Sequence, residues 1–76
     1  MKKKQKSFTI KPEFIGQTIF DLPPDFPKDY TQIHGVFLGG FIREGTDFTI
    51  DLENMSVSYD SGVPMSLQDS FTLVVY

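Results

Sequence analysis

Apolar and polar residues alternate in several short segments of the chain, the pattern of β-strands with one buried face. The first segment covers residues 5–11, in which Phe8 and Ile10 fall on the same side. The second covers residues 17–22 and is centred on Phe20. Pro and Gly residues between the two segments indicate a turn. The chain is therefore predicted to open with two strands joined by a turn.

The strongest alternation lies in residues 48–59. Its apolar positions are Phe48, Ile50, Leu52, Met55, Val57 and Tyr59. A two-residue turn at Glu53 and Asn54 places all six on one face of a hairpin. Because a slip of one residue would move the whole set into water, the register should be well specified.

Three other segments complete the predicted set of strands. Residues 30–38 are predicted to form one strand and residues 41–44 the returning strand of a hairpin. Gly39 and Gly40 provide the two-residue turn between them, because Gly tolerates the positive φ of type I′ and II′ turns. The last segment, residues 71–76, is apolar on both faces. Such a strand is either central in a sandwich or packed against a partner. Before it, Met65 and Leu67 are spaced to cap the core.

The stretch of residues 23–27 cannot be a regular element, because three of its five residues are Pro, which removes backbone donors and fixes φ. It is predicted to be a stiff loop. Phe26 lies in its middle and has two possible roles: a plug on the core or an exposed contact.

Together these elements predict an all-β fold, a small antiparallel β-sandwich or barrel of about six or seven short strands. The chain has 76 residues, enough for one domain, which we place at residues 7–76 behind a basic N-terminal arm at residues 1–6. The absence of Ala, the best helix former, agrees with this class. With no Cys, neither disulfides nor thiolate metal sites can staple the domain.

Charge divides the chain into two unequal parts. Residues 1–11 carry five Lys and no acid, giving +5, whereas residues 12–76 carry ten acids against Lys28 and Arg43, giving −8. The arm can be a solvated segment that keeps the domain soluble, an anchor for an acidic surface, or a weak nucleic-acid contact that salt abolishes. The acidic body argues against nucleic acid as the main partner, because it repels phosphates.

The sequence offers little for catalysis. His34 is the only His and falls in an apolar strand segment, and no Gly-x-Ser-x-Gly elbow is present. Asp47, Asp51 and Glu53 lack the spacing of an EF-hand loop. We therefore expect no enzyme, no cofactor, no metal and no small-molecule substrate. No apolar run reaches the roughly 18 residues of a membrane span or follows the first Lys residues as in a signal peptide, so neither membrane association nor export is expected.

Protein contacts are the remaining possibility. Eleven aromatic residues are many for so small a core, so some are expected to stay exposed and mark an interaction site. The candidate partner-binding residues combine the basic arm with aromatic positions: Lys2, Lys3, Lys4, Lys6, Phe26, Tyr30, Phe41 and Tyr76.

The order of the turns resembles a known module. Residues 36–76 contain V-F-L-G-G-F-I-R-E-G-T-D-F-T-I, then S-V-S-Y, then S-L-Q-D-S-F-T-L-V-V-Y. This is similar to a small β-sandwich module of tailed-bacteriophage virion proteins of the head-fibre, tail-fibre and auxiliary capsid type. That module has an Asn-Gly-type turn, a Gly-x-Asp-Tyr-Thr turn, a short Asp-containing turn and a last strand ending in Tyr. Residues 39–40 match the first turn with Gly for Asn, residues 45–49 match the second with Phe for Tyr, and residues 67–69 and 74–76 match the close.

The resemblance implies a non-enzymatic structural protein of a virion, assembled in the host cytoplasm. An auxiliary (decoration) capsid protein or a fibre-base component fits best, because no shaft sequence is present. Its partners would be other virion proteins of the capsid or tail and further copies of itself, a trimer being common among such modules. The alternative is a small acidic intracellular protein that inhibits a host factor by occupying a basic groove. The arm separates the two, because an anchor needs it and an acidic mimic does not.

Overall fold

The computed structural model describes residues 5–76, and within them it contains seven strands and no helix. The strands, in chain order, are β1 (Lys6–Ile10), β2 (Ile19–Asp21), β3 (Ile33–Phe37), β4 (Gly40–Arg43), β5 (Phe48–Asp51), β6 (Ser56–Tyr59) and β7 (Phe71–Val75). The predicted all-β class and strand number are confirmed. Within the described part of the chain, nothing has the helical length and apolar character needed to cross a membrane.

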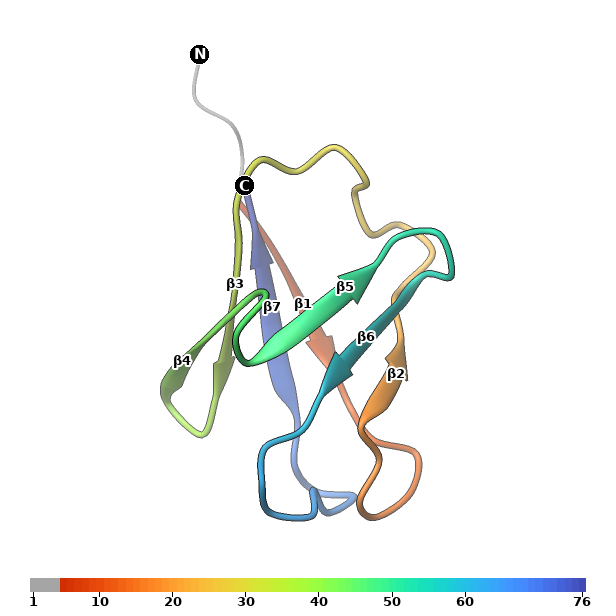
Figure 1. Ribbon diagram of the computed structural model, residues 1–76, viewed down its shortest axis with the longest axis vertical. Helices are drawn as coiled ribbons and strands as arrows, with labels where there is room; N and C mark the ends of the chain where they lie inside the picture. Colours follow the sequence, from red (N-terminus) through yellow and green to blue (C-terminus); the bar gives the residue numbers. More distant parts are fainter. Residues whose placement is uncertain (1–4) are drawn as a thin grey trace.

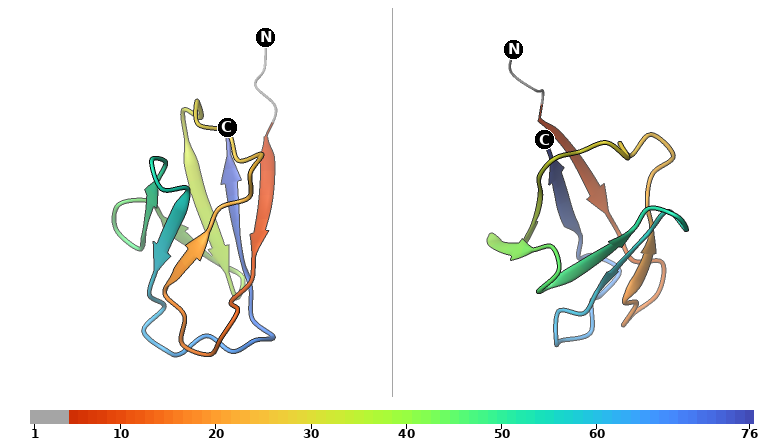
Figure 2. Two further views of the ribbon diagram at one scale, coloured as in Figure 1. Left: turned by 90° about the vertical axis from the view of Figure 1, so that its right-hand side faces the viewer. Right: turned by 45° about the horizontal axis from the view of Figure 1, so that its top comes forward.

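The strands form two antiparallel sheets that pack face to face (Figures 1 and 2). One sheet has the order β1-β7-β3-β4 and the other the order β2-β6-β5. Their inner faces enclose the core, whose fully buried side chains are Phe20, Phe48, Val57, Phe71, Leu73 and Val75. Phe20 of the smaller sheet meets Phe71 of the larger one edge to face, with ring centroids 5.0 Å apart. The fold is therefore a small β-sandwich.

The β5–β6 hairpin has the predicted register. Phe48 pairs with Tyr59 and Ile50 with Val57, so the alternating apolar residues face the core. The turn is longer than expected, because the strands end at Asp51 and begin again at Ser56. The Asp51 carboxylate closes this four-residue loop by accepting hydrogen bonds from the backbone N–H (3.1 Å) and the side-chain amide (2.8 Å) of Asn54.

The β3–β4 turn corrects the prediction at Gly39 and Gly40. Phe37 pairs with Gly40, so the two central residues are Leu38 and Gly39, at φ 51° and 79°. Positive φ at both positions is what a type I′ turn requires. The physical reason for the shift lies further along the hairpin, where this register sets Ile42 opposite Gly35 and so gives the Ile42 side chain room in the core.

Strand β7 lies between β1 and β3, which decides between the two alternatives for the C-terminal segment. It is a central strand with both edges paired within the chain. Phe71, Leu73 and Val75 face the core, while Val74 and Tyr76 belong to the outer side. Its two-sided apolar character therefore serves the core on one side and the outer surface on the other.

The proline-rich loop delivers Phe26 to the core. Its side chain is only 3% exposed and packs against Phe8, with ring centroids 5.1 Å apart, and against Tyr30, at 6.0 Å. The plug role is confirmed, and the proposed role of Phe26 in partner binding is wrong because the ring is covered. Of the two predicted caps, Met65 is buried, but Leu67 is exposed.

Candidate functional site

The two outer faces of the sandwich differ in chemistry. On the three-stranded sheet, cross-strand neighbours form one row of Ile19, Ser58 and Thr49 and another of Asp21, Ser56 and Asp51. Apart from Ile19, this face is polar and carries two carboxylates. It is an ordinary solvated surface that needs no partner.

The outer face of the four-stranded sheet is built from the residues that alternate with the core positions of its strands. The registers arrange them in two rows: Ser7, Val74, His34 and Arg43, and beside it Thr9, Thr72, Val36 and Phe41. Tyr76 continues the outer side of β7 beyond Val74. We call the apolar and aromatic part of this surface the aromatic face; it comprises His34, Val36, Phe41, Val74 and Tyr76.

The rings of the aromatic face contact one another. The imidazole of His34 lies between Phe41, at a centroid distance of 5.6 Å and an interplanar angle of 71°, and Tyr76, at 5.7 Å and 34°. Phe41 is nevertheless 78% exposed, because β4 is the edge strand and none of residues 5–76 covers its outer side. Aromatic rings in such offset and edge contacts stabilise each other's orientation. The face therefore presents a pre-arranged group of rings to a partner.

Backbone hydrogen bonds fix the two ends of this aromatic group. At the edge, the Asp47 carboxylate accepts the backbone N–H of Arg43 at 2.8 Å, and the Asp47 N–H donates back to the Arg43 carbonyl at 2.8 Å. At the other end, the Tyr76 N–H donates to the Gln32 carbonyl (2.9 Å), and its carbonyl accepts the Thr31 N–H (2.8 Å). Both aromatic ends of the face thus stand on hydrogen-bonded backbone rather than on free loops.

The charge on this sheet face is opposite to that of the chain as a whole. The chain has a formal net charge of −3, yet the two rows contain no carboxylate and carry a single full charge, that of Arg43. Lys6 is exposed at the start of β1, but it pairs with the core-facing Val75 and so lies on the other side of the sheet from this face. Among the described residues, the positive charge on this face is therefore that of Arg43, whose backbone N–H donates to the Asp47 carboxylate. Tyr, Phe and Arg are the residues enriched at the centres of protein interfaces.

The structure brings together only some of the predicted contact residues. Phe41 and Tyr76 lie on the aromatic face, whereas Lys6 pairs with the core-facing Val75 and lies on the other side of the sheet. Tyr30 is half-buried in the loop before β3, where burial, and secondly the charge of Glu44, raises the pKa of its phenol. Lys2, Lys3 and Lys4 lie outside the described residues.

Sequence reasoning missed the central place of His34. Its position in an apolar strand was recognised, but the aromatic neighbours on either side come from residues 41 and 76 and become visible only in the folded sheet. The signal that could have found it is the alternation of sides along a strand. Ile33 and Gly35 lie on the core side of β3, and His34 stands between them in the sequence. His34 therefore belongs to the outer face of the sheet.

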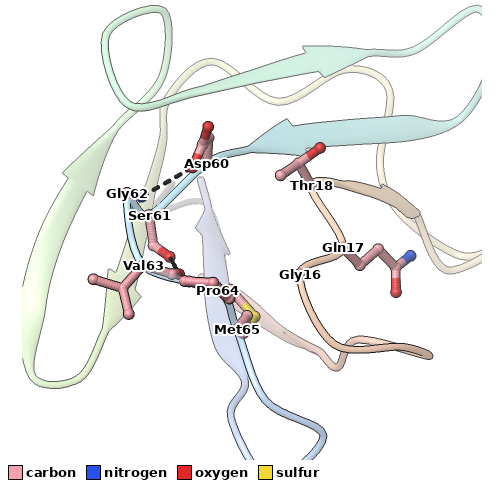
Figure 3. A pocket seen from close by; sticks show the side chains of 9 residues that line it. All are labelled: Gly16, Gln17, Thr18, Asp60, Ser61, Gly62, Val63, Pro64 and Met65. Atoms are coloured by element: carbon pink, nitrogen blue, oxygen red, sulfur yellow. Dashed lines mark hydrogen bonds between the residues drawn. The ribbon is translucent and has the colours of Figure 1, made fainter.

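A hollow between two loops of the described residues is lined by polar groups that bond within those loops. Among the described residues, no group of three His, Asp or Glu side chains could hold a metal ion. This pocket, of about 250 Å³, lies between residues 16–18 and residues 60–65 (Figure 3). Its polar side chains hold their own loop: the Asp60 carboxylate accepts the Gly62 N–H at 2.9 Å, and the Ser61 hydroxyl donates to the Val63 carbonyl at 2.6 Å.

No protein-family model, no curated protein and no solved structure matches this chain. What it does must therefore follow from its own faces, charges and contacts. Of these, the aromatic face is the feature that folding alone leaves without a reason.

Proposed function

We propose that this chain is a non-enzymatic structural protein of a bacteriophage virion, an auxiliary capsid protein or fibre-base component that attaches to its neighbours through the aromatic face. The observation that carries the proposal is the group of His34, Phe41 and Tyr76 on the outer side of the four-stranded sheet. The order of the turn motifs in residues 36–76 supports the virion assignment, and the sandwich fold agrees with it.

Attachment would work by face-to-face packing. A flat sheet face can pack against another at about 10 Å, and alternate side chains then fill the space between them. Phe41 is the anchor, because its ring is exposed at the free edge and would be desolvated by a partner. Since the strands already hold the aromatic group, little conformational entropy is lost on binding.

The charges around the face indicate the kind of partner surface. Arg43 borders the apolar centre, and the basic arm precedes β1 in the sequence. A complementary partner has an apolar patch flanked by carboxylates. Such charges at the rim act mainly on the rate and specificity of association.

The first test is mass spectrometry of purified particles of the virus that encodes the chain. We expect the protein in the particles at a fixed ratio to the capsid or tail proteins. Its absence from the particles refutes the virion proposal.

The second test compares two exposed apolar residues on opposite sides of the sandwich. Phe41→Ser removes the anchor of the aromatic face, and Ile19→Ser is its matched control on the three-stranded sheet, where Ile19 is 63% exposed. We expect particles assembled with the Phe41→Ser protein to lose it on washing, while the Ile19→Ser protein is retained as the wild type is. Equal retention of both variants removes the aromatic face from the proposal.

A second candidate function is an acidic inhibitor of a host factor, favoured by Asp21 and Asp51 in one row on the opposite sheet. Carboxylates on a flat face can occupy a basic groove. This function predicts that a chain lacking residues 1–6 binds its target at least as well as the full chain. The virion proposal predicts that the same deletion weakens attachment.

A further inference from the structure

The end of the sandwich opposite the C-terminus carries a second exposed apolar surface. There the loop between β1 and β2 and the loop between β6 and β7 lie side by side (Figures 1 and 2). The Gly16 N–H donates to the Met65 carbonyl at 3.0 Å and joins the two loops. We call this surface the loop end and define it by four side chains within two residues of that hydrogen bond: Phe14, Ile15, Val63 and Leu67.

All four side chains of the loop end are mostly exposed. The exposed fractions are 61% for Phe14, 68% for Ile15, 72% for Val63 and 56% for Leu67. With large apolar side chains exposing on the order of 150–200 Å² when fully open, this amounts to roughly 400 Å² per chain. The largest apolar patch of a typical monomer covers about 300–600 Å² and is often functional.

A hollow lies directly beside these exposed side chains. Residues 16–18 and 60–65 are joined at one end by the hydrogen bond from the Tyr59 N–H to the Thr18 carbonyl (2.8 Å) and at the other by the Gly16–Met65 bond. Between these two bonds the segments separate and leave the pocket of about 250 Å³ (Figure 3). The loop end therefore has two mostly exposed apolar residues, Phe14 and Ile15, directly before Gly16 on the wall of a recess of side-chain size.

We propose that the loop end is a self-association surface, through which two copies of this chain meet end to end about a two-fold axis. In a two-fold contact the same patch serves on both copies, so the exposed side chains of one can meet the recess of the other. The loop end carries both, side by side. Two copies bury about 800 Å² of apolar surface, and a polar rim brings the total toward the ~1,000 Å² that a specific contact needs.

The charges near the loop end favour a protein over a lipid surface. Glu13, Asp60 and Asp69 lie in the same two loops, against Lys11. An acidic rim is repelled by the anionic lipids of a membrane surface. In a pair of chains the same acids repel weakly, so the apolar contact has to drive the pairing and added salt should not weaken it.

The pairing does not depend on the proposed virion function, because it uses a different surface. The aromatic face covers the outer side of the four-stranded sheet, and its Tyr76 lies at the end of the molecule away from the loops (Figure 1). Both surfaces can be occupied at once. A pair of chains would then present two aromatic faces to its neighbours and gain avidity from the second.

Sedimentation of the full-length chain tests the pairing, from about 10 µM to about 1 mM, a range that spans weak affinities. We expect a concentration-dependent shift from 8.7 kDa to twice that mass, and persistence of the dimer at ~1 M salt, where charge contacts are screened. The Phe14→Ser and Val63→Ser variants should each weaken dimerisation at least tenfold. Since both side chains are mostly exposed, the variants keep the core and should unfold at the temperature of the wild type.

Phe41→Ser is the matched control, an equally apolar and exposed position outside the loop end. It should leave dimerisation unchanged. A chain that stays monomeric throughout, a trimer, or a dimer that Phe41→Ser dissociates and Phe14→Ser does not, overturns the proposal. A monomer that cosediments with phosphatidylcholine vesicles also overturns it and identifies a membrane as the occupant instead.

Discussion

Gly35 is the position at which a single added methyl group should disturb the core most. It lies in β3 on the inner side of the four-stranded sheet, opposite Ile42 of β4. A Cβ built there would lie 2.5 Å from Cγ1 and 2.7 Å from Cδ1 of Ile42, and 3.4 Å from Cε1 of Phe48. The first two distances are too short for carbon atoms in contact. In Gly35→Ala, the Ile42 side chain must therefore leave its rotamer or push the hairpin outward.

The size of the effect follows from two opposing contributions. Overpacking a core by one methyl group costs typically about 1–3 kcal/mol. Replacing Gly by Ala also restricts the unfolded chain, which stabilises the fold by roughly 0.4–1 kcal/mol where the backbone conformation is tolerated. Gly35 has no positive φ, so that gain applies. We expect a net loss of about 1–2 kcal/mol in the free energy of unfolding.

Urea unfolding followed by far-UV circular dichroism measures this loss. For a chain of this size a slope near ~1 kcal/mol per molar urea is expected, so the midpoint should fall by about 1–2 M. Gly40→Ala is the matched control, in the same hairpin without positive φ, where a Cβ would have only an ordinary contact at 3.5 Å from the Phe37 carbonyl oxygen. Its midpoint should stay level or rise.

A second variant tests the cause of the loss. Ile42→Ala removes both atoms that a Cβ at residue 35 would strike, Cγ1 and Cδ1, at its own cost of about 2–5 kcal/mol. If the clash is the cause, the double variant Gly35→Ala, Ile42→Ala is more stable than the sum of the two single effects. Additive effects, or a Gly35→Ala protein as stable as Gly40→Ala, would refute the steric explanation.

Three further predictions concern turns and titrating groups. Leu38→Asn should raise stability by about 1 kcal/mol in urea unfolding, because Asn accepts the left-handed conformation that Leu38 holds at φ 51°, whereas Leu38→Ala should show no such gain. The hydrogen bonds from Asn54 lower the pKa of Asp51. The stabilisation by this carboxylate is therefore present above the unfolded pKa of about 3.8 and is lost as pH falls through the folded value. In Asp51→Ala, the urea midpoint should fall less steeply as the pH is lowered. Burial, and then two nearby carboxylates, raise the pKa of Tyr59, so stability is full below the unfolded pKa of 10.0 and falls as pH rises through the folded value. Tyr59→Phe should keep its urea midpoint at alkaline pH where the wild type loses stability.

The sequence pattern predicted those features of the fold that depend on residues close together in the chain. Alternation identified the strands and the faces of β1, β5 and β6, and it fixed the register of the β5–β6 hairpin, because any other register exposes its apolar set. The position of the β3–β4 turn was wrong because it depends on a contact across the hairpin. Two Gly residues favour a turn at 39–40, but space for Ile42 beside Gly35 moves it to Leu38 and Gly39.

The candidate sites depend on the order of strands in the sheets, which no local pattern contains. His34 meets Tyr76 because β7, the last strand, lies beside β3, and it meets Phe41 because β4 returns along the other edge. The loop end likewise needs two loops about fifty residues apart to be joined at Gly16 and Met65. Leu67 was placed in the core on spacing alone, yet it projects from this loop end.

The core-facing and outward-facing positions of a strand carry different information about function. Positions that face the core must be apolar for the sandwich to fold, so Phe48 or Leu73 says nothing about function. Outward-facing positions are free of that requirement. Ser58 and Thr49 show this on the three-stranded sheet, which folds with a polar outer surface. An exposed ring such as Phe41 adds nothing to that folding requirement and leaves apolar surface in water. The outer face of the four-stranded sheet gathers aromatic rings, whereas the outer face of the other sheet is polar. A partner surface that covers these rings therefore explains them best.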